Sequence, residues 1–163
     1  MVSRSSLCRM LVAALMVLTL GLGWGSPAQA TSYDRQSLRS TDWSHQDLRG
    51  NNYTSADMAD ADMSYANLRG VRLFDTTLAR ANMEGADMTG ATLDGARFFQ
   101  ANLTNAILEG AYAIGTDFRE ATIVGADFTD VLLDPKANQL LCEVATGTNP
   151  VTGRNTRDTL YCF

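Results

Sequence analysis

A five-residue repeat constrains the fold of this 163-residue chain more than any other feature. One copy, Ala101-Asn102-Leu103-Thr104-Asn105, shows the unit: an alanine, a small polar residue and a large apolar centre. The frame runs without a break through 20 centres from Leu38 to Leu133, and Ala113 is the single small centre. Alanine stands two residues before the centre in 12 of the 20 units. The repeat therefore has one large and one small apolar position per unit.

A period of five matches neither an α-helix nor a β-strand, so one helix or strand cannot keep all the centres on one buried face. If each unit forms one side of a square, four units complete a coil of about 20 residues and every centre points inward. The array then predicts about five coils and a rod of roughly 24 Å, from the ~4.8 Å spacing of adjacent strands. Each buried Leu, Met or Phe contributes about 1.5–3 kcal/mol, so the centres form a continuous core.

This pattern resembles the pentapeptide-repeat family, whose usual unit is A(D/N)LXX. Clean copies are Ala56-Asp57-Met58, Ala66-Asn67-Leu68 and Ala126-Asp127-Phe128. The resemblance implies an all-β solenoid, namely a right-handed quadrilateral β-helix with a short α-helical C-terminal cap. We assign the array to residues 36–135 and a lead-in to residues 31–35. The first four units lack the alanine, which predicts a frayed or capped first coil.

Residues 1–30 differ from the array and are typical of a secretory signal peptide. Arg4 and Arg9 precede the apolar run Leu11–Leu22, and Ala28-Gln29-Ala30 forms the cleavage site. The run is short for a transmembrane helix, so we expect no stable membrane insertion after cleavage; retention as an uncleaved anchor is the alternative. Cleavage removes two of the 13 basic residues and none of the 18 acidic ones, which changes the net charge from −5 to −7. Such an acidic chain is unsuited to direct binding of nucleic acid.

Cleavage also removes Cys8 and leaves Cys142 and Cys162, both beyond the array. An even number of cysteines in an exported chain favours a disulfide, with two free thiols or a redox switch as alternatives. Closing a loop of about 20 residues would stabilise the tail by about 3 kcal/mol.

The tail, residues 136–163, also contains helix signals. Asp134 and Pro135 form an N-cap and a first helical position, and Thr156 is expected to cap a second short helix. We expect the tail to cover the open end of the β-helix, because the unpaired backbone there would otherwise pair with another chain.

The tail carries a second resemblance, to the end of the thylakoid-lumenal pentapeptide-repeat proteins of cyanobacteria and chloroplasts. It rests on Leu141-Cys142, on the segment from Gly147 to Gly153, and on Thr156–Leu160 with Cys162. The resemblance implies an oxidised lumenal protein with a disulfide-tied cap. The short signal favours a cyanobacterial chain, and the periplasm is the alternative compartment because a secretory signal does not distinguish the two.

Four large apolar side chains are expected on the exterior of one face of the rod. Grouping every fourth unit places Phe74, Tyr112, Ile114 and Leu132 there, and we call these four residues the apolar patch. Exposed apolar clusters mark interaction sites, or are covered by another part of the chain. We expect the tail to fold back over the patch; a docking surface for a protein partner, including a second copy, is the alternative.

The sequence marks no catalytic residue and no cofactor or metal site. The Asp and Asn residues before the centres belong to the repeat unit and are expected to bond the turns. No calcium-loop motif is present, and no carboxylate pair stands out from its neighbours. His45 has Ser44 and Asp47 near it in the sequence, but this grouping is not specific enough to indicate a catalytic triad. We expect His45 at the surface, at a corner of a coil.

Three classes of function follow. The first is a non-enzymatic exported scaffold or protein-interaction module, a monomer or weak dimer with an unknown protein partner. The second is a DNA-mimicking topoisomerase (gyrase) modulator, which the export signal disfavours. The third is a carbohydrate-active β-helix, which would need a groove with aromatic and acidic pairs that the sequence does not indicate.

Overall fold

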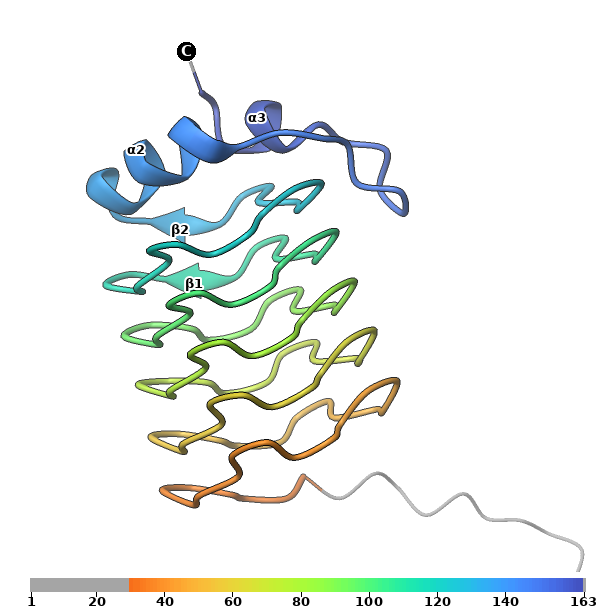
Figure 1. Cartoon of the computed structure of the whole chain (residues 1–163), viewed down its shortest axis with the longest axis vertical. Helices are drawn as coiled ribbons and strands as arrows, with labels where there is room; N and C mark the ends of the chain where they lie inside the picture. Colours follow the sequence, from red (N-terminus) through yellow and green to blue (C-terminus); the bar gives the residue numbers. More distant parts are fainter. Residues whose placement is uncertain (1–29, 163) are drawn as a thin grey trace, which may run out of the picture.

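The computed structural model describes residues 30–162, which form a rod of stacked coils with a helical segment at one end (Figure 1). Parallel bridges join residues 20 positions apart, from Ser32 with Asn52 to Ile107 with Asp127. Near the C-terminal end the chain forms β1 (Tyr112–Ala113) and β2 (Leu132–Leu133), a parallel pair with Tyr112 opposite Leu132. The predicted β-helix of four units per coil is therefore confirmed. The predicted signal peptide lies outside the described residues, apart from Ala30.

Both apolar positions of each unit point into the rod. The alanines and the large centres form one cluster of buried residues that continues from coil to coil. Thr76 and Thr116 occupy alanine positions, and their buried hydroxyls donate to the carbonyls of Tyr53 at 2.7 Å and Leu93 at 2.8 Å. A threonine is tolerated there because its polar atom finds a backbone acceptor inside the coil.

A tight turn closes each side of a coil. The amide at the alanine position donates back to the carbonyl of the preceding centre, as from Ala56 to Tyr53 at 2.9 Å. The residue two positions after a centre has a positive φ, 64° at Gly70 and 62° at Asp60. The Asp or Asn before a centre accepts the amide two residues later, as Asp62 does from Ser64 at 2.9 Å. These polar residues serve the turns, as predicted.

The array begins earlier than the sequence predicted. The amide of Tyr33 donates to the carbonyl of Asn52 at 2.7 Å, and that of Arg35 to Thr54 at 2.9 Å. Residues 31–35 are therefore part of the first coil, and the expected lead-in and fraying were wrong. The first coil is regular without alanines because backbone hydrogen bonds join each of its sides to the second coil.

Two helices cover the C-terminal end (Figure 1). In α2 (Pro135–Val144) the N-cap Asp134 accepts the amide of Ala137, as predicted. In α3 (Thr156–Thr159) the N-cap is Asn155, which accepts the amide of Arg157; the expectation that Thr156 caps this helix was wrong. Asn155 is the N-cap because it lies just outside the helix, where its side-chain oxygen can accept an amide of the first turn. Among the described residues, no helix has the length and apolar character needed to cross a membrane.

Candidate interaction surface

The apolar patch is open to solvent. The side chains of Phe74, Tyr112, Ile114 and Leu132 are 50%, 51%, 51% and 54% exposed. The expectation that the tail folds back over the patch was therefore wrong. The tail instead packs on the end of the rod, where Leu141 and Leu160 join the core. There it covers the last coil, whose backbone edge would otherwise be exposed.

The ladder register divides the patch into a cluster and an outlier. Tyr112 and Leu132 are directly paired neighbours on consecutive coils, and Ile114 follows two residues after Tyr112 on the same face. Phe74 stands two coils away from Ile114, roughly 10 Å at the usual strand spacing. Asp94 lies between them in the column and accepts the amide of Ile114 at 3.0 Å. The continuous apolar surface is thus Tyr112, Ile114 and Leu132.

A hollow of about 240 Å³ adjoins this cluster where α2 crosses the last coil. Phe118 and Leu140 supply apolar lining, and Arg119, Lys136, Asp117 and Asp134 supply the charged lining. The Arg119 guanidinium bonds Asp117 at 2.7 Å and lowers the pKa of that carboxyl. Gly115, which follows Ile114 directly in the chain, is part of the lining, so the apolar cluster and the hollow with its charged lining are neighbours.

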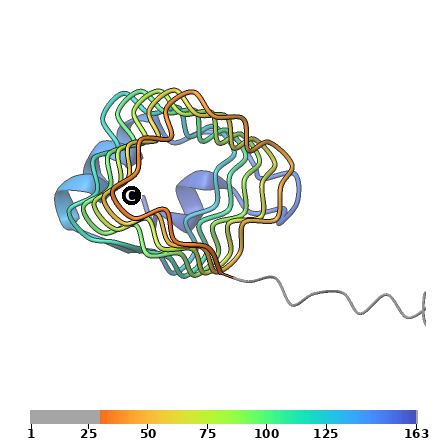
Figure 2. The same cartoon turned by 90° about the horizontal axis from the view of Figure 1, so that it is seen from below.

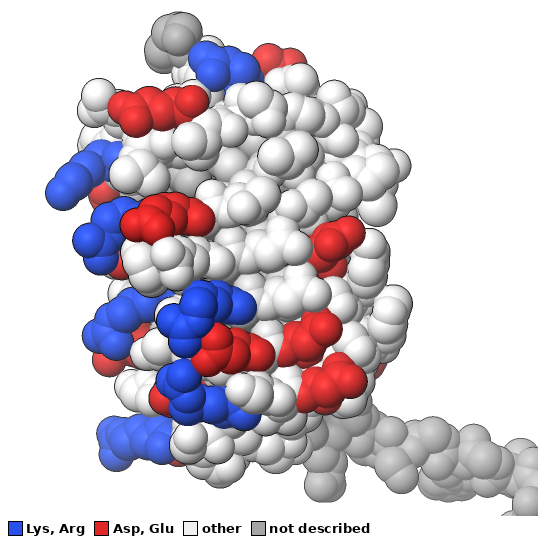
Figure 3. Space-filling model, in the orientation of Figure 1, with Lys and Arg blue, Asp and Glu red and all other residues white. Residues whose placement is uncertain are grey.

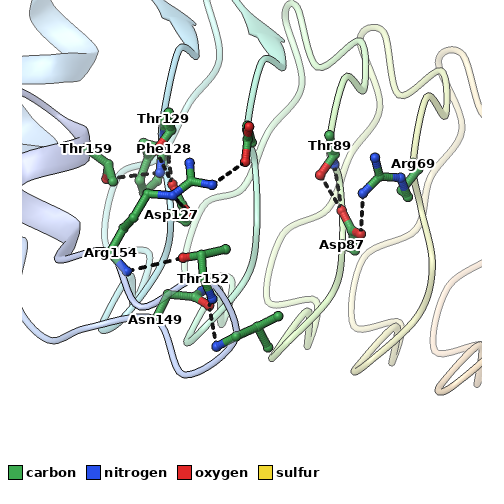
Figure 4. Close-up of polar contacts among 12 residues, drawn as sticks. Arg69, Asp87, Thr89, Asp127, Phe128, Thr129, Asn149, Thr152, Arg154 and Thr159 are labelled. Atoms are coloured by element: carbon green, nitrogen blue, oxygen red, sulfur yellow. Dashed lines mark hydrogen bonds and ion pairs between the residues drawn. The ribbon is translucent and has the colours of Figure 1, made fainter.

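Asn149 fastens the tail to the backbone of the last coils. It is fully buried, and its amide group donates to the carbonyls of Asn105 at 3.0 Å and Gly125 at 2.9 Å. Its oxygen accepts the amides of Val151 and Thr152, which shapes the tail loop (Figure 4). The Asn149 side chain therefore forms hydrogen bonds with backbone groups of both the coil and the loop that covers it.

Arg154 makes the second connection between tail and coil. Its guanidinium lies 2.7 Å from Glu109 and 3.4 Å from Asp127, whose side chain is fully buried (Figure 4). Burial opposes the charge on Asp127, but hydrogen bonds from the hydroxyl and amide of Thr129 and the charge of Arg154 outweigh it. The pKa of Asp127 is accordingly lowered.

A disulfide joins Cys142 in α2 to Cys162 after α3, with the two Cα atoms 5.5 Å apart. Between these cysteines, the hydroxyl of Thr159 accepts the amide of Phe128 at 3.1 Å (Figure 4). The disulfide therefore closes the segment that carries Asn149, Arg154 and Thr159 over the last coil.

Charged residues on the outside are mixed in sign. Arg39 bridges Asp57 and Asp60, and Arg80 reaches Asp60 at 2.7 Å. On the face shown in Figure 3, most basic side chains lie along one edge of the rod, and acidic side chains lie beside them. These partly exposed ion pairs contribute little to the free energy of unfolding.

His45 lies at an exposed corner, as predicted, and stacks on Tyr65 with the ring centroids 5.2 Å apart. In the part of the chain that the structure describes, no three His, Cys, Asp or Glu side chains are placed to share a metal ion.

The comparisons with known proteins agree with the fold. A pentapeptide-repeat family model matches residues 66–105 and 96–134. A pentapeptide-repeat protein from the thylakoid lumen of Arabidopsis thaliana is 42% identical, with a TM-score of 0.78 over 79% of this chain and 90% of that one. This chain belongs to the pentapeptide-repeat family.

Two further proteins are similar to this chain. A pentapeptide-repeat protein from Nostoc is 25% identical, with a TM-score of 0.55 over 81% of this chain and 96% of that one. The thylakoid lumenal protein TL20.3 of Arabidopsis thaliana chloroplasts is 54% identical over 37 residues, 23% of this pentapeptide-repeat chain. That match spans 13% of the length of TL20.3. The family's thylakoid-lumenal members, predicted from the tail, are thus among the relatives found.

Sequence reasoning missed the hollow and the two tail connections. The hollow depends on the angle at which α2 crosses the last coil, and no residue pattern signals that angle. Asn149 lies in the segment from Gly147 to Gly153, which is rich in turn-forming residues, and the residues near Arg154 in the sequence do not indicate its partners. Asn149 before Pro150 was a usable signal for a structured loop, but it did not indicate contacts with residues more than 20 positions away.

Proposed function

We propose that this pentapeptide-repeat protein is a non-enzymatic scaffold of the thylakoid lumen that binds another protein through Tyr112, Ile114 and Leu132. The observation that carries this proposal is the half-exposed apolar cluster beside the hollow under α2. A partner would place one apolar side chain in the hollow, against Phe118 and Leu140, while Lys136 and Arg119 contact polar groups around it. Burying large apolar side chains at the centre of an interface is the usual source of its affinity.

Two observations support the lumen as the compartment. The similar Arabidopsis proteins are described as thylakoid lumenal. The tail of this chain is also closed by Cys142 and Cys162, and such disulfides persist in oxidising compartments.

Intact mass of the protein isolated from its source tests the compartment. We expect a chain beginning at Thr31, with Cys142 and Cys162 open to alkylation only after reduction. A full-length chain whose thiols react without reduction would contradict export and oxidation together.

A capture experiment tests the surface. The chain from Thr31 onward, Ile114→Asp and Val151→Asp would each be cross-linked to a lumenal extract. Val151 is 77% exposed on the tail loop, outside the cluster, and provides a matched control. We expect a specific cross-linked partner with the wild type and Val151→Asp and its loss with Ile114→Asp, because a buried carboxylate opposes docking. Equal capture by all three would contradict the proposed surface.

A further inference from the structure

Helices cover one end of the rod, and no described helix covers the other. α2 and α3 lie over the last coil, whereas the view from the other end shows no described helix across the first coil (Figure 2). In later coils the residue before each centre donates its amide to the coil below, as Asp57 does to Gln36 at 2.9 Å. The amides of Ser37, Asp42 and Asp47 hold this position in the first coil, and they have no partner among the described residues.

The carbonyls of the same three residues also have no partner within residues 30–162. In the second coil the carbonyl of Asp57 accepts the amide of Leu38 at 2.7 Å, so this carbonyl points toward the coil below. Ser37, Asp42 and Asp47 therefore each direct an N–H and a C=O away from the rod. In an antiparallel pair, two facing residues exchange both of these hydrogen bonds. The open edge is thus complementary to a second edge of its own kind.

The core beneath this edge is incompletely buried. Tyr33 stacks on Tyr53 with centroids 5.0 Å apart, and Trp43 meets Tyr33 edge-on at 5.5 Å. Tyr33, Leu38 and Trp43 are only partly buried, unlike the centres of the middle coils. The Nε1 atom of Trp43 is buried without a hydrogen-bond partner in the described chain. A second layer over the first coil would complete the burial of these side chains.

The charge of the first coil suits contact with a copy of itself. Residues 31–50 contain three aspartates and three arginines, so they are neutral overall, whereas the whole chain carries −5. Arg49 bonds Asp47 at 2.7 Å, and Asp42 accepts the amide of Ser44. Two first coils can therefore approach without the net repulsion expected between other parts of an acidic rod.

We propose that the first coil is an interface between two copies of this chain, joined end to end by antiparallel pairing at Ser37, Asp42 and Asp47. The helices block the other end, so copies cannot stack head to tail into a filament. The contact is therefore isologous and closes at a dimer. Tyr112, Ile114 and Leu132 lie toward the far end of each rod, which leaves both copies of the proposed partner surface free.

Sedimentation velocity of the chain from Thr31 onward tests the proposal. We expect a dimer that dissociates on dilution. Ser37→Pro removes the donor and places a ring at the edge; a proline is tolerated there because this amide has no partner within the described chain. We expect this variant to be a folded monomer at concentrations where the wild type is dimeric. Ser37→Ala keeps the amide and is expected to remain dimeric.

Hydrogen exchange of the wild type gives a second, independent test. The amides of Ser37, Asp42 and Asp47 should be protected at high concentration and exchange faster on dilution, while Asp57 stays protected at both. This measurement decides the matter if Ser37→Pro fails to fold. A monomer at every concentration, or a dimer in which these three amides exchange freely, would overturn the proposal. So would a dimer that survives Ser37→Pro but is lost in Ile114→Asp.

Discussion

Gly125 and Gly110 occupy equivalent corners but have different surroundings. Their φ angles are 69° and 65°, in the left-handed region that strains other residues. A Cβ on Gly125 would meet the carbonyl oxygen of Thr148 at 3.3 Å and collide with the side chain of Asn105. A Cβ on Gly110 would meet nothing within 4 Å. Glycine at position 125 therefore permits the close approach of the tail.

We expect Gly125→Ala to destabilise the protein more than Gly110→Ala. Both variants should lose about 1 kcal/mol through the left-handed backbone. Gly125→Ala should lose more, because the loop at Thr148 must move. Denaturant unfolding measures both losses, and equal values would show that the tail loop does not depend on this contact.

Asp127 should make the protein sensitive to acid. The pKa of Asp127 is lower in the folded state than in the unfolded state, where it is about 4. The ionised carboxylate therefore contributes fully to the free energy of unfolding above about pH 4, and this contribution is lost as the pH falls through the lower folded pKa. We expect Asp127→Asn to cost about 2 kcal/mol at neutral pH, because Arg154 loses a buried partner. The cost should shrink below about pH 4. Urea unfolding at several pH values measures it; a cost independent of pH would contradict the ion pair.

At the scale of elements, the tail has little core of its own and depends on attachments. α2 contributes Leu141 to the core, while α3 is only four residues long and lies between the Asn149 loop and Cys162. A helix this short is not stable by itself, so its position depends on the disulfide and on the contacts with the last coil.

We expect reduction of the disulfide to cost the tail about 3 kcal/mol, from the entropy of the opened loop. The exchange of the Phe128 amide should accelerate, because its acceptor, the Thr159 hydroxyl, lies within that loop. Hydrogen exchange with and without reductant measures this effect. The Cys142→Ser and Cys162→Ser double variant serves as the control, since reductant should not change it further. Unchanged protection of the Phe128 amide would show that the other contacts hold the tail on the last coil without the disulfide.

At the scale of the molecule, bridges between residues 20 positions apart join each coil only to its neighbours. The free energy of unfolding is therefore approximately a sum of contributions from the coils and their interfaces. Deleting residues 76–95 removes one coil and keeps every face in register. We expect a folded protein with a free energy of unfolding lower by roughly one fifth. Deleting residues 76–93 instead shifts the frame by two and turns centres outward, so it should prevent cooperative unfolding. Calorimetry compares the two, and similar melting would contradict a strict period.

The five-residue frame was sufficient to predict the β-helix, its buried centres and the polar residues at its turns, and the Asp134-Pro135 pair predicted the helix cap. Such local and periodic features are determined by residues that are close together in the sequence. The extension of the array to Tyr33 was missed, because the backbone ladder there does not require an alanine.

The frame also placed Phe74, Tyr112, Ile114 and Leu132 on one exterior face, but it did not decide what covers them. Their exposure, the hollow beside Ile114 and the contacts of Asn149 and Arg154 depend on where the tail packs. The sequence by itself determined which side chains point into the rod, because that follows from a repeating local geometry. Only the tertiary structure decided which end is closed and which surface stays open, because those outcomes depend on contacts between segments far apart in the chain.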